Sequence, residues 1–155
     1  VCPTGALTGK QWARKGRYEG IRQVDTTCPY CGTGCTLTVH VNVKDNEIAR
    51  ITSKPWAANE GWLCVKGRFG YKFVNSPDRL TKPLIRRKSG DFEETTWTAA
   101  IEYTASWLKR IKEQYGPDAI GGLSSARCTN EENYLFQRFM RATIGTNNVD
   151  HCARL

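Results

Sequence analysis

The sequence lacks any apolar run that approaches the roughly 20 residues a membrane-spanning helix needs, so we expect no membrane span in the visible chain. It also lacks any block of five like charges, although 23 Lys and Arg residues against 15 Asp and Glu residues give a formal charge of +8. A positive balance favours an anionic partner such as nucleic acid, phosphate or a small carboxylate. Scattered positive charges are equally typical of a solvated surface, and the charge alone therefore selects no function.

An even number of cysteines, which disulfide frameworks in secreted domains prefer, is absent as well. The chain has seven, of which four fall in one pattern and three stand alone. We therefore expect a metal site in a reducing compartment. With 39% hydrophobic and 10% aromatic residues, the 155 residues can build a packed core, as one ordinary domain or as two small ones.

Alternating apolar residues predict a β-hairpin with strands at residues 36–43 and 47–52. Residues 63–74 fit a short helix. Two further short strands are expected at residues 80–87 and 92–97, on either side of a Ser-Gly turn. This part of the chain is therefore expected to be rich in β-structure.

Beyond these strands the apolar pattern becomes helical. Thr98 can cap a helix that ends at residues 116–117, and residues 119–123 suit a short buried strand. Thr129 and Glu132 have the spacing of a capping box, which predicts the start of a second helix. The alternation of helix and strand is typical of an α/β layer.

The second helix is followed by a further strand, which is expected to begin at Val149. Helix, strand, helix and strand in this order predict the beginning of an α/β layer with a parallel sheet. The residues that the second helix is expected to bury are Leu135, Phe136, Phe139, Met140 and Ile144.

The most informative feature is a pattern of four cysteines, C-x2-C-x3-C-x28-C, formed by Cys28, Cys31, Cys35 and Cys64. Four thiolates can hold a [4Fe-4S] cluster, and Gly32 and Gly34 allow the first loop to turn tightly around one side of it. Tetrahedral zinc usually takes two C-x2-C pairs, whereas this pattern has one. The spacing therefore favours a cluster over zinc.

The remaining cysteines and histidines carry less information. Cys128 and Cys152 have no partners at ligand spacing, and we interpret both as small core residues. His40 falls on the polar side of a predicted strand, where a structural role is expected. A single histidine at position 151 indicates no particular chemistry.

The cysteine loop at residues 28–35 and the segment at residues 61–70 resemble the N-terminal iron–sulfur domain of the molybdopterin-guanine-dinucleotide oxidoreductases. Residues 122–134 and 145–155 resemble, more specifically, the formate dehydrogenases of that family. The resemblance covers nearly the whole chain from residue 25. It implies the catalytic (alpha) subunit of an enzyme that oxidises formate to carbon dioxide.

The resemblance also implies roles for individual residues. A [4Fe-4S] cluster is bound by the four patterned cysteines, and Lys66 lies between this cluster and the pterin and relays electrons, as a catalytic and cofactor-binding residue. The active metal, Mo or W, is held by two molybdopterin guanine dinucleotides. The implied partners are formate and electron-transfer subunits that carry iron–sulfur clusters, flavin or hydrogenase centres, with no nucleic acid.

Cys2 belongs to a Cys-Pro segment that resembles the end of a bacterial ferredoxin motif. Because the chain starts with Val1, we expect its N-terminus to be cut, with the other ligands of a second [4Fe-4S] cluster upstream. This arrangement resembles that of cytoplasmic enzymes coupled to nicotinamide or hydrogenase subunits, so a cytoplasmic location is expected.

The predicted fold class is α+β. The expected divisions are the tail of a ferredoxin-like domain at residues 1–9, a linker at 10–24, a small β-rich [4Fe-4S] domain at 25–80, and the start of an α/β molybdopterin-binding domain at 81–155. Two alternatives stay open. One is a nitrate reductase or a respiratory NADH dehydrogenase large subunit of the same fold, and the other is a zinc-stabilised module that binds nucleic acid.

In formate dehydrogenases the segment that resembles residues 147–155 is followed at once by the metal-ligating selenocysteine or cysteine, and then by a histidine. We therefore expect the chain to be inactive alone, because that ligand lies beyond Leu155. Since UGA encodes selenocysteine and is otherwise read as a stop, the hypothesis is that codon 156 is UGA.

Overall fold

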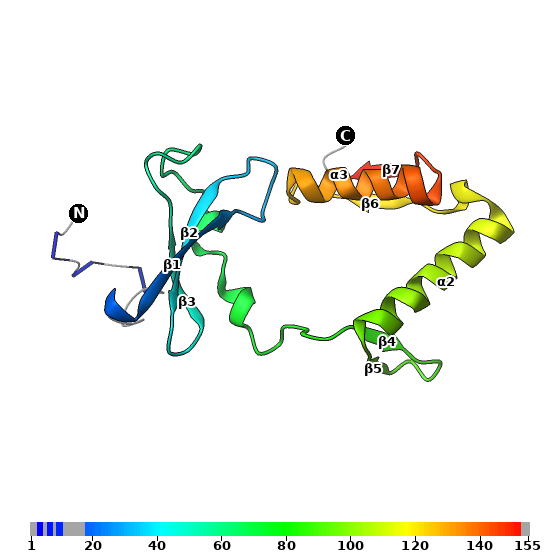
Figure 1. Ribbon diagram of the computed structural model, residues 1–155, viewed down its shortest axis with the longest axis horizontal. Coiled ribbons are helices and arrows are strands. Elements are labelled where there is room, and N and C mark those ends of the chain that lie inside the picture. Colours follow the sequence, from blue (N-terminus) through cyan, green and yellow to red (C-terminus); the bar gives the residue numbers. More distant parts are fainter. Residues whose placement is uncertain (1–2, 5, 8, 11–17, 153–155) are drawn as a thin grey trace. The chain divides into compact units, whose positions relative to one another are not determined.

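The computed structural model describes residues 3–4, 6–7, 9–10 and 18–152 (Figure 1). The chain divides into two compact units between Arg79 and Leu80. Among the described helices, none is long and apolar enough to cross a membrane. The predicted α+β class is confirmed, since both units combine helices with small sheets.

The first unit is built on a three-stranded antiparallel sheet in the order β1-β2-β3. The predicted hairpin is confirmed as β2 and β3, with Val39 opposite Ile51. In its turn Asn46 has a φ of 52°, a left-handed conformation that Asn tolerates better than most residues. The elements of this unit are η1 (Tyr18–Gly20), β1 (Ile21–Thr27), β2 (Thr36–Asn42), β3 (Glu47–Thr52), α1 (Val65–Phe69) and η2 (Lys72–Asn75).

Strand β1 was not expected. It begins at Ile21 and pairs along its whole length with β2, so the linker prediction is wrong for residues 21–24. The strand lies at the edge of the sheet, and six of its seven residues are exposed. An edge strand without a buried face need not alternate polar and apolar residues, and its sequence therefore carries no clear strand pattern.

The core of the first unit lies on one face of this sheet. Leu37 and Ile51 pack there with Cys28 and with Tyr71, whose hydroxyl donates a hydrogen bond to the carbonyl of Ala49 (3.0 Å). The first cysteine of the pattern is therefore part of the hydrophobic core. Partly buried residues that pack around this cluster are Tyr30, Cys35, Val39, Ile48 and Leu63.

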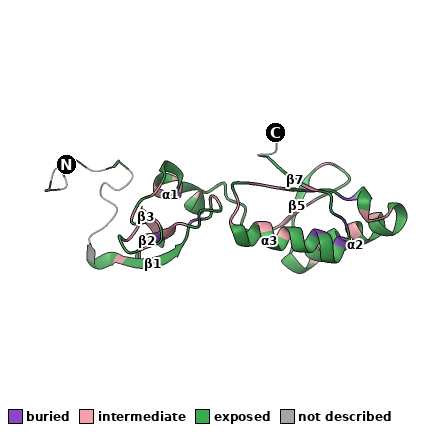
Figure 2. Ribbon diagram, turned by 90° about the horizontal axis from the view of Figure 1, so that it is seen from above, coloured by how far each residue is buried: buried purple, intermediate pink, exposed green. Residues whose placement is uncertain are grey.

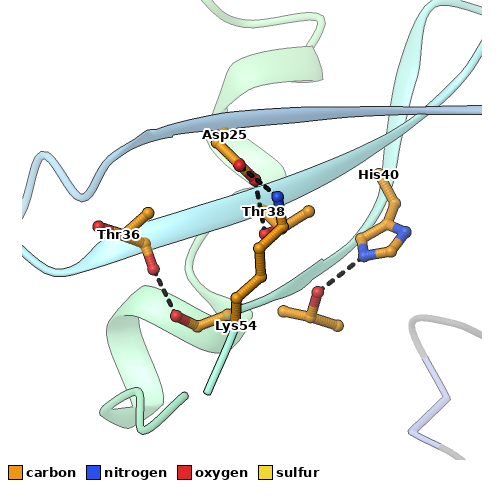
Figure 3. A network of polar contacts seen from close by, with 7 residues as sticks. Asp25, Thr36, Thr38, His40 and Lys54 are labelled. Atoms are coloured by element: carbon orange, nitrogen blue, oxygen red, sulfur yellow. Dashed lines mark hydrogen bonds and ion pairs between the residues drawn. The ribbon is translucent and has the colours of Figure 1, made fainter. Parts of the chain in front are cut away.

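The other face of the sheet carries a polar network in which Thr38 and His40 are buried (Figure 3). Thr38 donates a hydrogen bond to Asp25 (2.8 Å), and Lys54 forms an ion pair with the same carboxylate. His40 Nε2 lies 2.8 Å from Thr52 Oγ1. Lys54 and then Thr38 lower the pKa of Asp25, while burial lowers the pKa of His40. These contacts fit the structural role expected for His40.

The second unit holds the predicted parallel pair, β6 and β7, with Gly122 opposite Val149. A separate antiparallel pair, β4 and β5, precedes the long helix α2. The start of an α/β layer is therefore confirmed. The elements of this unit are β4 (Leu84–Arg86), β5 (Phe92–Glu94), α2 (Trp97–Tyr115), η3 (Pro117–Ala119), β6 (Gly122–Ser124), α3 (Asn130–Arg138), the π-helix η4 (Phe139–Ile144) and β7 (Val149–His151).

The helix starts are set by threonine caps. The capping box is confirmed, because Thr129 Oγ1 accepts the amide of Glu132 (3.2 Å) and the Glu132 carboxylate accepts the amide of Thr129 (2.7 Å). For α2 the predicted cap was wrong. Thr96 rather than Thr98 accepts the amide of Ala99 (3.2 Å), since Thr98 already lies in the first helical turn.

The apolar face predicted for α3 is only partly buried. Met140 and Ile144 pack against Ile120, but Leu135 and Phe139 are 60% and 40% exposed, so their predicted burial was wrong. A 3.6-residue spacing shows which side chains share a face of the helix, but not whether another element covers that face. The chain changes from α- to π-geometry at Phe139, and Met140 and Ile144 of the π-helix are the buried members of the face. The ribbons of α2 and α3 accordingly show mostly exposed residues (Figure 2).

Gly122 brings β6 close to α3. A Cβ atom at this position would lie 2.8 Å from the Phe136 ring and 3.2 Å from Met140 Cε, whereas one at Gly121 would meet only the Asn148 carbonyl oxygen, at 3.9 Å. We expect Gly122→Ala to lower the local stability of the β6–α3 packing by about 1–3 kcal/mol through overpacking. Hydrogen exchange of the β6 and β7 amides in the full chain measures this loss. Gly121→Ala is the matched control, and equal exchange in the two variants would contradict the close packing.

Candidate functional site

The loop that carries three of the four patterned cysteines connects β1 to β2. Cys28 and Cys35 stand at its two ends, and the Cys28 amide donates a hydrogen bond to the Cys35 carbonyl (2.8 Å). Gly34 has a φ of 66°, a conformation that only glycine adopts without strain. The pairing of β1 with β2 therefore fixes the two ends of the loop, and the glycine allows it to close.

Cys64 reaches this loop from the start of α1. Its sulfur accepts a hydrogen bond from the Gly67 amide (3.5 Å), and a Cβ atom on Gly67 would lie 3.6 Å from the sulfur of Cys28. Gly67 therefore contacts one cysteine with its amide and faces another with its α-carbon. This position brings the cysteine that is distant in sequence into the neighbourhood of the loop.

The pKa shifts of the thiols also indicate that the four patterned cysteines lie near one another. Burial raises the pKa of the Cys28 thiol, and the charges of the other three patterned thiols raise it further. The pKa of Cys31 is lowered, chiefly by its hydrogen bond with the Thr33 hydroxyl (3.3 Å) and also by the positive charge of Lys66. The structure thus brings together all five residues that the sequence analysis assigned to this site. Their roles as ligands and as an electron relay stay predictions.

Four thiols form the kind of donor set that a [4Fe-4S] cluster takes. Within the described residues, no three Cys, His, Asp or Glu side chains lie close enough together to hold one metal ion. A zinc ion with bonds of about 2.3 Å would need its sulfurs within about 4 Å of each other. In a [4Fe-4S] cluster each cysteine binds a different iron, so the thiolates lie farther apart. The donor set, four thiols with graded exposure from buried Cys28 to exposed Cys64, suits that group.

Tyr30 ties the loop to the segment after α1. Its hydroxyl donates a hydrogen bond to the Gly70 carbonyl, and its ring meets Phe73 edge-on with centroids 6.4 Å apart. A Cβ atom on Gly70 would lie 2.7 Å from the Tyr30 hydroxyl oxygen, so this contact needs glycine. The sequence analysis did not identify Tyr30, because a tyrosine between two cysteines has no pattern that reveals its partner.

The other three cysteines differ in what the structure describes. Cys2 falls outside the described residues, so its predicted role as a ligand of a second cluster is untested. Cys128 is half-buried, but Cys152 is exposed, and the expectation that it fills the core was wrong. Its sulfur lies 3.5 Å from the Ser125 hydroxyl oxygen, and this contact, followed by the Ala126 amide, lowers the pKa of Cys152.

A polar pocket of about 320 Å³ lies in the second unit at the carboxyl ends of β6 and β7. In open α/β sheets this edge is where ligands bind. Asn133 of α3 supports the rim, since it accepts a hydrogen bond from the Ser124 hydroxyl and donates one to the Ser125 carbonyl (3.2 Å). Side chains that line the pocket include Ser125, Gln137, Arg141, Asn147, Asp150 and His151.

A larger hollow of about 530 Å³ lies between α2 and η4. Its lining is almost entirely apolar and includes Ile101, Leu108 and Phe139. Its polar groups are limited to two lysines, two threonines and the indole N–H of Trp97. The smaller pocket at the strand ends, with its cationic and hydroxyl groups, is therefore the better candidate for polar ligands.

Two relatives are named as alpha subunits. The F420-dependent formate dehydrogenase subunit alpha of Methanocaldococcus jannaschii is 53% identical over 133 residues, which are 85% of this chain and 19% of that protein. The NADPH-Fe(3+) oxidoreductase subunit alpha of Geobacter sulfurreducens is 42% identical over 155 residues, which are 100% of this chain and 18% of that protein. The chain thus spans less than one fifth of the length of these relatives.

Models of two protein domains match the two units. The model of the molybdopterin oxidoreductase Fe4S4 domain matches residues 21–76, which include the sheet, the four patterned cysteines and Lys66. The molybdopterin oxidoreductase model matches residues 79–155, which include the parallel strands and the polar pocket. Together with the two relatives, these matches show that the chain belongs to the molybdopterin oxidoreductase family, as an Fe4S4 domain followed by part of a molybdopterin domain.

Proposed function

We propose that this chain is part of the catalytic subunit of a formate dehydrogenase. The observation that carries the proposal is that Cys28 and Cys64 meet at Gly67, within reach of the charges of Cys31 and Cys35, in a chain that is 53% identical to a formate dehydrogenase subunit alpha over 133 residues. When bound, a Mo or W bis-molybdopterin guanine dinucleotide supplies the two-electron oxidation of formate to carbon dioxide, and a [4Fe-4S] cluster supplies a carrier for the electrons.

The residues of the first unit would bind the cluster and stabilise its charge. Cys28, Cys31, Cys35 and Cys64 would hold it as thiolates. Deprotonation of Cys28 is opposed by burial and by the neighbouring thiols, whereas at Cys31 it is favoured by the hydrogen bonds with Thr33 and also by the charge of Lys66. A fixed ammonium group also stabilises the additional negative charge of a reduced centre. Lys66 is therefore proposed as the residue that supports electron transfer between the pterin and the cluster.

The second unit would contribute the polar pocket at the ends of β6 and β7. Its hydroxyl groups and Arg141 can donate hydrogen bonds to an anionic or polar ligand. We propose it as part of the surface that holds the pterin cofactor. We also propose a cytoplasmic location, electron-transfer partner subunits, and a second cluster with Cys2 among its ligands.

A second candidate function is the oxidation of NADPH coupled to the reduction of Fe(III). It is favoured by the relative from Geobacter sulfurreducens, which aligns with all 155 residues and is named for that reaction. The zinc-stabilised nucleic-acid-binding module has less support, since the matched family is one of oxidoreductases. Dye reduction by formate compared with Fe(III) reduction by NADPH, both measured with the whole enzyme, separates the first two candidates.

The cluster assignment predicts that alanine at Cys28, Cys31, Cys35 or Cys64 abolishes assembly of the complete cluster and destabilises the first unit, because metal binding and folding are coupled. Anaerobic analysis should find about four iron and four sulfide per wild-type chain, with brown colour and a low-temperature paramagnetic signal after reduction. Cys128→Ala, in the second unit, is the control. An intact signal in any of the four variants would remove that cysteine from the ligand set.

The role of Lys66 predicts that Lys66→Ala keeps metal and cluster in the whole enzyme but slows formate oxidation about tenfold or more. The reason is that the loss of a nearby positive charge can remove up to several kcal/mol of electrostatic stabilisation. Lys66→Arg should recover part of the rate through its charge. Lys72→Ala, at another exposed lysine of the same unit, serves as the control. Wild-type turnover of the Lys66→Ala enzyme would exclude Lys66 from the electron path.

The resemblance of residues 147–155 to formate dehydrogenases predicts the next codons of the gene. Codon 156 should be UGA for selenocysteine, or a cysteine codon, with a histidine codon after it. A selenol ionises more readily than a thiol, whose pKa is about 8.5, and is a ready anionic metal ligand at neutral pH. Sequencing genomic DNA across this point is the measurement. Any other sense codon at 156 would move the proposal toward the nitrate reductases.

A further inference from the structure

The segment between β3 and Cys64 has no helix or strand, yet it must hold one of the four patterned cysteines in place. Its chain runs through three turns closed by backbone hydrogen bonds, the last from the Trp62 amide to the Asn59 carbonyl (2.8 Å). Glu60 and Gly61 both have positive φ values, 49° and 80°. A non-glycine residue in the left-handed region is strained and persists only where its surroundings enforce it.

The side chain of Asn59 makes three contacts that provide such enforcement. Its Oδ1 accepts a hydrogen bond from the Thr36 amide (2.9 Å), and its Nδ2 donates to the Trp62 carbonyl (2.6 Å) and to the Ser53 hydroxyl (3.0 Å). The Ser53 hydroxyl in turn donates to the Thr36 carbonyl (2.6 Å), a bond that is drawn in Figure 3. Both backbone groups of Thr36 are therefore held, directly or through Ser53, by one asparagine.

The groups that Asn59 contacts lie close to two of the patterned cysteines in the sequence. Thr36 follows Cys35 directly, and Trp62 precedes Cys64 by two residues. Trp62 is held at both its amide and its carbonyl, by the main chain and the side chain of Asn59 respectively. Asn59 thus joins the end of the three-cysteine loop to the segment of the fourth cysteine, across a large separation in sequence.

We propose that Asn59 is the positioning residue that sets Cys64 against Cys35 and thereby secures the iron that Cys64 binds. This inference rests on the proposed assignment of the four cysteines as cluster ligands. An amide is required because it accepts on one side and donates on the other. A carboxylate could still accept the Thr36 amide, but it would present a negative oxygen to the Trp62 carbonyl and lose the second link.

The test compares Asn59→Ala and Asn59→Asp with wild type and with Asn75→Ala in the full chain, loaded anaerobically with iron and sulfide. Asn75 is a matched control, because it also joins two backbone groups of the first unit, the Ile48 amide (3.4 Å) and the Asn46 carbonyl (3.5 Å), but at the opposite end of the β2–β3 hairpin. The readout is the rate at which ferricyanide oxidises [4Fe-4S]²⁺ to [3Fe-4S]⁺ with release of one Fe²⁺ and one electron, followed by the paramagnetic signal of the three-iron product.

Both Asn59 variants are expected to bind the cluster and to lose one iron about tenfold faster than wild type, because two or more of the hydrogen bonds that join the segment of Cys64 to Thr36 are lost. Asn75→Ala should lose iron at the wild-type rate. Rates for the Asn59 variants within twofold of wild type would overturn the proposal. Hydrogen exchange of the β2 amides shows whether the sheet survives, and if Asn59→Ala unfolds it, the rate measured for Asn59→Asp decides.

The same experiment separates this inference from the assignment on which it rests. If wild-type chain binds no four-iron cluster, or if Cys64→Ala retains all four irons against ferricyanide, the cluster assignment is wrong and the role of Asn59 falls with it. If the cluster forms and depends on Cys64 but the Asn59 variants behave as wild type, only the positioning role is wrong.

Discussion

The first unit depends on the gathering of four thiols, one of which comes from a distant part of the chain. Ionised thiols that lie close together repel each other, and each opposes the ionisation of the next; at Cys28 this repulsion adds to burial, which is the main cause of its raised pKa. The fold must therefore hold the thiols in place before a metal compensates their charge. The groups that hold them are uncharged: the sheet, the core around Cys28 and backbone amides. One cation, Lys66, acts on Cys31 in addition.

Glycines give this scaffold its close contacts. At Gly67 the absence of a side chain leaves room for the sulfur of Cys28, and at Gly70 it leaves room for the hydroxyl of Tyr30. Gly34 serves a different purpose, since its positive φ turns the loop between the second cysteine and the third. Metal binding and folding are coupled in such a unit, because the same loops that would bind the cluster also complete the core.

Local patterns predicted well what depends on local interactions. The β2–β3 hairpin and the Thr129 capping box were predicted correctly because alternation and capping involve residues a few positions apart. Strand β1 was missed because an exposed edge strand has no apolar side to reveal it, and the exposure of Leu135 was missed because helical spacing shows which residues share a face but not whether another element covers that face. The cysteine spacing indicated the candidate ligands, but not the residues that hold these ligands in position.

The residues that support the cysteines could not be predicted from local patterns. Asn59 and Tyr30 act on groups whose neighbours in space are set by the sheet, so no spacing in the sequence indicates their partners. Their identification required the positions of Thr36 and Gly70.

The second unit differs from the first in how it would bind a charged group. A helix start beside the end of a parallel strand usually offers free amides to an anion. In α3 the capping box satisfies the amide of Glu132 with Thr129, and two glutamates occupy the first turn. This helix start therefore repels an anion rather than attracting one. An anionic group in the pocket at the ends of β6 and β7 would be bound by Arg141, so recognition there depends on a side chain and not on the helix dipole.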